Sequence, residues 1–153
     1  MLIVLAVLIG IVAGLRAFTA PAAVSLAVRY GHIAVAGTPL AFLGYRWTPW
    51  IFLALALLEL VGDQLPATPS RKVPMQFGAR IVMGALAGAG IAAAGGLYVG
   101  LAAGAVGAVI GTLGGAEARK QLVAATGGRD LPIALVEDAV AVFGALLIVS
   151  AVS

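Results

Sequence analysis

The sequence predicts an all-α integral membrane protein that folds as a single bundle, residues 1–153, of about five transmembrane helices, some of them broken or kinked. The first observation is composition: 63% of the residues are hydrophobic and only 10% are charged, whereas soluble domains are about half apolar and roughly a quarter charged. The second is length, because the apolar runs supply about five stretches of roughly 20 residues, each sufficient to cross a hydrocarbon core of about 30 Å. We therefore expect the lipid bilayer to be the solvent of this chain.

The first apolar stretch, residues 2–30, is interrupted by "GLRAFTAP". Pro21 removes an intrahelical hydrogen bond and crowds the preceding turn, so we expect either one kinked helix or a re-entrant pair. The N-terminus has no basic region ahead of its apolar run, since its first charge is Arg16, and we interpret it as a retained segment rather than a signal peptide.

A loop ending in "YRWTPW" follows, and its aromatic residues are typical of a membrane interface. The second segment runs from Trp50 to Leu65 and stops at Pro66. The next loop, "PATPSRKVPMQFGAR", is the most polar region and includes Arg71, Lys72 and Arg80.

The third and fourth segments, about Ile81 to Leu97 and Tyr98 to Val123, are rich in Gly and Ala. Their glycines form two rows with a spacing of four: Gly96, Gly100 and Gly104, then Gly107, Gly111 and Gly115. Such rows put small residues on one helical face and predict close helix packing. The partner is either the same chain or a second copy, and we expect a homodimer through these faces.

The fifth segment runs from Pro132 to Val152, with Asp130 as a candidate N-cap. If all five segments cross, the N-terminus shares a side with the loops carrying Arg71, Lys72, Arg80, Lys120 and Arg129. The positive-inside rule then places the N-terminus in the cytoplasm and the C-terminus outside.

Two sequence echoes suggest an inverted repeat with units 1–97 and 98–153. "ALLELVGD" matches "ALVEDAVA", which pairs Glu59 with Glu137, and "AGLRAFTAPAAVSLAVRYG" matches "GGAEARKQLVAATGG", which predicts a second broken helix. Inverted repeats are common in secondary transporters. Short apolar matches also arise by chance in a chain this rich in Ala, Leu and Val.

The scarce acidic residues are the candidate site. Glu59 lies about 13 Å beyond Trp50, near the bilayer centre, and Asp63 follows one turn later on the same face. A charge at that depth costs at least about 2.5 to 3.5 kcal/mol, so these groups must be paired, hydrated or protonated. We predict that Glu59, Asp63, Glu137, Asp138 and Glu117 surround a proton or cation site, with Arg16 as counter-ion.

Each of these residues also has a structural interpretation. Glu59 and Asp63 could form a polar knot with Arg16 that fixes helix register, and Asp63 could be interfacial. Only one of Glu137 and Asp138 is expected to face inward, the other being a first-turn acid favoured by the helix dipole. Glu117 could belong to a solvated helix end together with Arg119 and Lys120.

Other functional classes find little support. The chain has no Cys and one His, His32, so neither thiol chemistry nor a histidine metal site is expected, and no cofactor is implied. No nucleophile elbow or phosphate loop is present, which argues against an enzyme. No dense basic face with interleaved aromatics indicates nucleic-acid binding.

The stretches "GLRAFTAP", "LELVGDQLP" and "ALVEDAVA" resemble the bacterial membrane-protein family of domain of unknown function 4126. Gly14 to Phe18, Glu59, Asp63, Pro66, Glu137 and Asp138 carry the match. The resemblance implies a small multi-helix protein of a bacterial inner membrane and no settled activity. More weakly, "ELVGDQ" is similar to the Glu-x-Gly-Asp signature of cation/proton exchangers, with an extra residue between Glu59 and Gly62.

Two functional hypotheses follow. The first is a small inner-membrane transporter or channel-like carrier with an intramembrane acidic site for a proton, a cation or another small solute. The alternative is a non-transporting scaffold, or a lipid- or partner-binding module, in which the same charges lock the bundle. A polar cavity that reaches the acids would favour transport, and a buried, fully paired cluster would favour the scaffold.

Overall fold

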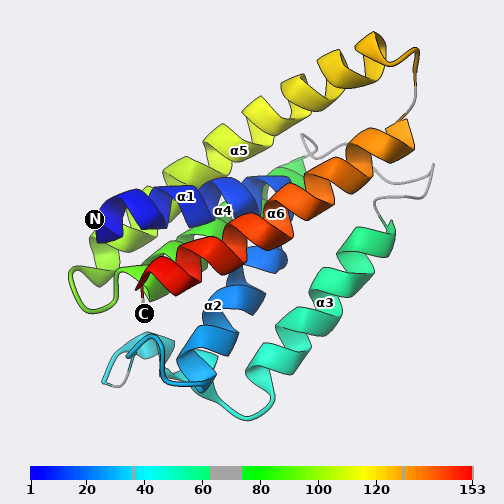
Figure 1. Ribbon diagram of the computed structural model, residues 1–153. Helices are drawn as coiled ribbons and strands as arrows, with labels where there is room; N and C mark the ends of the chain where they lie inside the picture. Colours follow the sequence, from blue (N-terminus) through cyan, green and yellow to red (C-terminus); the bar gives the residue numbers. More distant parts are fainter. Residues whose placement is uncertain (36, 63–73, 129, 153) are drawn as a thin grey trace.

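A computed structural model describes residues 1–35, 37–62, 74–128 and 130–152, and all regular structure within them is helical. The predicted all-α class is therefore confirmed. The elements, drawn in Figure 1, are α1 (Leu2–Leu15), α2 (Thr19–Arg29), the short 3-10 helix η1 (Pro39–Gly44), α3 (Thr48–Gly62), α4 (Pro74–Ile91), α5 (Leu97–Ala125) and α6 (Asp130–Val152).

Glycines hold α1, α4 and α5 against one another. A Cβ added to Gly104 of α5 would lie closer than 3.0 Å to the backbone of Gly84 in α4, and one added to Gly10 of α1 would collide with Gly104 itself. The predicted close packing is confirmed, and the partner of these faces is the same chain. A homodimer remains a prediction, and it would need a surface other than these occupied glycine faces.

The predicted break in the first apolar stretch is also confirmed. Arg16 ends α1 in an extended conformation, with φ −143° and ψ 110°, and α2 begins at Thr19. Pro21 falls in the first turn of α2, where backbone N–H groups have no intrahelical partner and the missing one is not needed. The proline therefore permits a new helix to start, and it does not kink an existing one.

α1 and α2 form a helical hairpin whose tip lies inside the bundle. α1 runs antiparallel to α6, because Val12 lies next to Gly144 while Arg16 bonds to Asp138. α2 runs parallel to α6, because Ala23 and Ala27 face Leu146 and Ser150 across one cavity. The two helices have 14 and 11 residues, so their lengths are only about 21 and 17 Å. Residues 2–30 therefore form two helices that fold back on each other and not one kinked helix.

The hairpin changes the arrangement of the chain ends. Both termini lie at one end of the bundle (Figure 1), which also holds Gly95, in contact with Leu2. We call this the terminal end, and the opposite end holds residues 126–128 between α5 and α6. If the helices cross a membrane, both termini would lie on one side and not on the expected opposite sides, because the chain turns back between α1 and α2. The break expected in the second repeat is also wrong, since α5 is continuous from Leu97 to Ala125. The repeat itself remains a prediction.

Two of the described helices, Leu97–Ala125 and Pro132–Val152, are long and apolar enough to cross a membrane, with hydropathies of 1.8 and 2.2. Large apolar side chains also point outward from the bundle, among them Leu58, Phe143 and Leu147, each more than 60% exposed. Membrane association fits these features, because a lipid bilayer can surround apolar side chains that would otherwise be exposed to water.

Candidate functional site

Charged side chains from α3, α4, α5 and α6 gather around the hairpin tip. We call this group the tip cluster: the cations Arg16, Arg80 and Arg119 and the anions Glu59, Glu137 and Asp138. Their side chains are between 0% and 19% exposed. Buried charges of both signs must be paired or hydrogen-bonded to be tolerated, and here they are.

Glu59 of α3 holds the hairpin tip through the backbone. Its Oε2 accepts a hydrogen bond from the N–H of Ala17 at 2.8 Å, and its Oε1 accepts one from the N–H of Phe18 at 3.1 Å. These amides precede the first turn of α2, where N–H groups lack intrahelical partners and the helix dipole favours a negative charge. Glu59 therefore caps α2 from a different helix.

Arg16 bonds to the opposite side of the tip and is fully buried. Its Nε donates to Asp138 Oδ1 at 2.6 Å, and its Nη1 donates to Glu137 Oε1 at 3.4 Å and to the carbonyl of Leu15 at 2.9 Å. Arg16 thus makes the contacts with acidic side chains that are expected of a counter-ion. The expectation that only one acid of α6 faces inward is wrong, because the guanidinium is wide enough to reach both.

Arg80, expected to be a loop charge, is instead a buried part of the site. It is 3% exposed, its Nη1 donates to the carbonyl of Gly14 at 3.1 Å, and its Nη2 lies 3.7 Å from Glu59 Oε2. Thr112 of α5 donates to the same carbonyl at 3.4 Å. The signal in the sequence was Pro74, a residue favoured in the first turn of a helix, which would have placed Arg80 inside α4.

Arg119 also belongs to the tip cluster, whereas Glu117, two residues earlier in α5, does not. Its Nη1 lies 3.4 Å from Glu137 Oε2, so Glu137 is shared between Arg16 and Arg119. Glu117, predicted as part of the acidic site, is exposed and accepts a hydrogen bond from Gln121 of its own helix at 3.1 Å. Asp63, also predicted there, lies outside the described residues.

The surroundings of the tip cluster are mostly apolar. A cavity of about 170 Å³ between α5 and α6 touches Arg119 and Glu137, and its remaining lining includes Leu122, Val136 and Val140. Within the described part of the chain, no group of three His, Cys, Asp or Glu side chains is placed to bind a metal ion. Thr19, 7% exposed, has a hydroxyl without a hydrogen-bond partner among the residues described.

Fold and site together define a class: a small helical bundle with a helical hairpin whose tip is held by buried ion pairs. Residues 3–151 match the family model described as a domain of unknown function, DUF4126, and the chain belongs to this family. No curated protein and no solved structure gives a significant match. The further similarity to cation/proton exchangers stays a prediction.

Proposed function

We propose that the chain is a multi-pass membrane protein in which α3, α4, α5 and α6 cross the bilayer and α1 and α2 form a re-entrant hairpin. The apolar composition and the outward-facing Leu58, Phe143 and Leu147 support this placement. Broken and re-entrant helices are tolerated at membrane depth where they are buried in protein, as the hairpin tip is here. The family resemblance favours a bacterial inner membrane.

The hairpin reverses the orientation that the positive-inside rule favours. Lys120 lies in α5 toward the opposite end, and in the sequence Arg71 and Lys72 come between α3 and α4, and Arg129 between α5 and α6. The terminal end has fewer basic residues, chiefly Arg29 and Arg46. The rule now places the opposite end in the cytoplasm and both termini outside, which replaces the expected cytoplasmic N-terminus.

As the first candidate function we propose proton-coupled transport, with the hairpin tip as the moving part and Glu59 as the proton-binding group. The observation that carries this proposal is the Glu59 carboxylate on the amides of Ala17 and Phe18. Charge-assisted hydrogen bonds are roughly twice as strong as neutral ones, so protonation of Glu59 weakens its hold on the tip. The same proton removes the counter-charge of Arg80, 3.7 Å away.

A proton is favoured over a metal cation as the coupling ion. Each described carboxylate of the tip cluster already has an arginine within 4.0 Å, and a divalent ion would have to displace these cations. Protonation needs no such rearrangement. Discontinuous helices with their N-termini at mid-membrane are also the usual construction of secondary transporter sites.

Flux into proteoliposomes tests the proposal. The full chain is reconstituted with an internal pH-sensitive dye, and proton flux is followed while small organic ions and divalent cations are offered in turn. We expect a solute-dependent proton flux that Glu59→Gln reduces at least about tenfold, since removing a proton-transfer group typically costs a factor of 10² or more. Glu117→Gln is the matched control, because Glu117 is exposed, and its flux should equal that of the wild type.

The complete pairing of the tip cluster favours a second candidate, a non-transporting membrane scaffold. In that case Glu59, Arg16 and their partners only fix the hairpin. No flux for any solute in folded wild-type protein would select this alternative. Equal flux in Glu59→Gln and wild type would retain transport and reject the site.

A further inference from the structure

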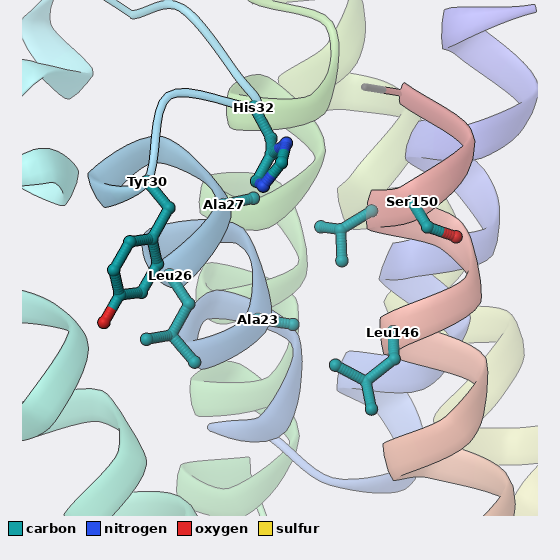
Figure 2. Close-up of a pocket in the computed structure, with 8 residues that line it drawn as sticks. Ala23, Leu26, Ala27, Tyr30, His32, Leu146 and Ser150 are labelled. Atoms are coloured by element: carbon teal, nitrogen blue, oxygen red, sulfur yellow. The ribbon is translucent and has the colours of Figure 1, made fainter.

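A second cavity, of about 260 Å³, lies between α2 and α6 at the terminal end, away from the tip cluster. Figure 2 shows its two walls, with Ala23 and Ala27 on α2 facing Leu146 and Ser150 on α6. The hollow exists because alanines occupy successive turns of α2 on the face that looks toward α6. We call this cavity the α2–α6 slot.

The α2–α6 slot is polar at one end only. His32 and Ser150 lie at the upper end in Figure 2, whereas the buried Ala23 and the half-exposed Leu146 lie lower in the view. In sequence, His32 follows the end of α2 and Ser150 precedes the end of α6, so the polar end is the one nearest the surface of the bundle. The lining of the slot therefore suits an amphipathic ligand whose polar head lies at the mouth and whose apolar tail lies along the apolar part.

The mouth of the slot lies where lipid headgroups would be. Tyr45, Trp47 and Trp50, between η1 and the first turn of α3, are all at least half exposed, and such aromatics sit at headgroup level. Arg29 ends α2 and Arg46 precedes α3, while no Asp or Glu occurs in residues 1–58 or 139–153. The charged side chains in these two stretches are therefore all basic, which favours an anionic phosphate at the terminal end.

We propose that the α2–α6 slot binds one acyl chain of a glycerophospholipid, with the lipid phosphate at the mouth beside His32 and Arg29. The volume supports partial rather than complete enclosure, because 260 Å³ is just under the roughly 300 Å³ at which small-molecule sites begin. One tail enters, and the rest of the lipid stays in the bilayer. The proposal rests on the membrane placement above and does not depend on proton transport.

Native mass spectrometry of the detergent-purified, delipidated full chain tests this site. The probes are phosphatidylglycerol and a diacylglycerol with the same chains but no phosphate. We expect one tightly bound phosphatidylglycerol molecule per chain and weaker binding of diacylglycerol. Ala27→Leu fills the slot and should weaken phosphatidylglycerol binding about tenfold or more, because several buried methylenes of the tail are displaced. Ala54→Leu, at an exposed position of α3, is the matched control and should bind as the wild type does.

Two further variants separate the tail from the head. Ala23→Val fills the same slot by a smaller amount and replaces Ala27→Leu if that variant fails to fold. Arg29→Gln should weaken phosphatidylglycerol and leave diacylglycerol unchanged. Unchanged lipid binding in both slot variants, or an equal loss in Ala54→Leu, overturns the site. Equal affinity for the two lipids overturns the phosphate contact. If the wild type shows no proton flux but Ala27→Leu still weakens lipid binding, proton transport is rejected and the slot is retained.

Discussion

Glu59 Oε2 accepts a hydrogen bond of 2.8 Å from the backbone N–H of Ala17, which lies 42 residues earlier in the chain. The contact joins α3 to the tip of the α1–α2 hairpin. It also satisfies a donor that a helix start would otherwise leave without a partner inside the bundle. The Glu59 carboxylate thus holds the turn between α1 and α2 and also balances part of the positive charge around it.

Replacing Glu59 by Gln should destabilise the fold. The new amide keeps one acceptor oxygen but presents an NH2 group to a backbone donor or to Arg80, so one hydrogen bond is lost in a buried setting. We expect a cost of about 1 to 3 kcal/mol in the free energy of unfolding. Unfolding in detergent, followed by circular dichroism, measures it. Glu117→Gln should change the stability by less than about 0.5 kcal/mol; equal losses in the two variants would contradict the capping role of Glu59.

Removing the charge of Arg16 should be more damaging. Arg16→Gln leaves Glu137 and Asp138 without their shared buried cation, and breaking a buried pair costs about 3 to 5 kcal/mol. Adding Asp138→Asn removes one of the two negative charges that Arg16 contacts, so the double variant should be more stable than Arg16→Gln alone. A double-mutant cycle measures the coupling. Strictly additive effects would show that these two side chains do not interact.

The glycine packing predicts a sharp contrast between two positions of α5. In Gly104→Ala the new methyl group would collide with the backbone of Gly84, and neither backbone can move without opening the α4–α5 contact. In Gly114→Ala nothing lies within 4 Å of the added Cβ. We expect Gly104→Ala to lower the unfolding temperature strongly, and Gly114→Ala to leave it unchanged or raise it, since Ala is favoured over Gly in helices by about 1 kcal/mol. The reverse order would show that α5 does not pack as described.

The absence of cysteine allows a direct test of the proposed orientation. Ala34→Cys places a single thiol at an exposed position of the terminal end, and Ala125→Cys places one at the exposed last residue of α5. A membrane-impermeant maleimide added to whole cells should label Ala34→Cys, and it should label Ala125→Cys only after permeabilisation. The opposite pattern would place both termini in the cytoplasm. Labelling of both variants in intact cells would argue against a crossing between these positions.

Local sequence signals predicted much of the fold. Hydropathy predicted an all-helical bundle, the "GLRAFTAP" stretch predicted the break at Arg16, and the glycine spacing predicted close packing. Each of these signals depends on neighbouring residues along one helix, which is why it is readable without a structure. The scarcity of acids likewise pointed to Glu59, Glu137 and Asp138, because a charge in an apolar helix requires a partner.

Only the tertiary structure decided what those segments do together. Two short helices around a break can continue in one direction or fold back, and here they fold back, with α1 packed against α4 and α5 and α2 packed against α3. The direction of every later helix relative to the termini follows from that choice. The same choice brings Arg80 and Arg119 to the tip, although along the sequence they look like charges at loop and helix ends. The physical reason is that hydropathy and spacing are properties of one helix, whereas the partner of a buried charge depends on which helices lie side by side.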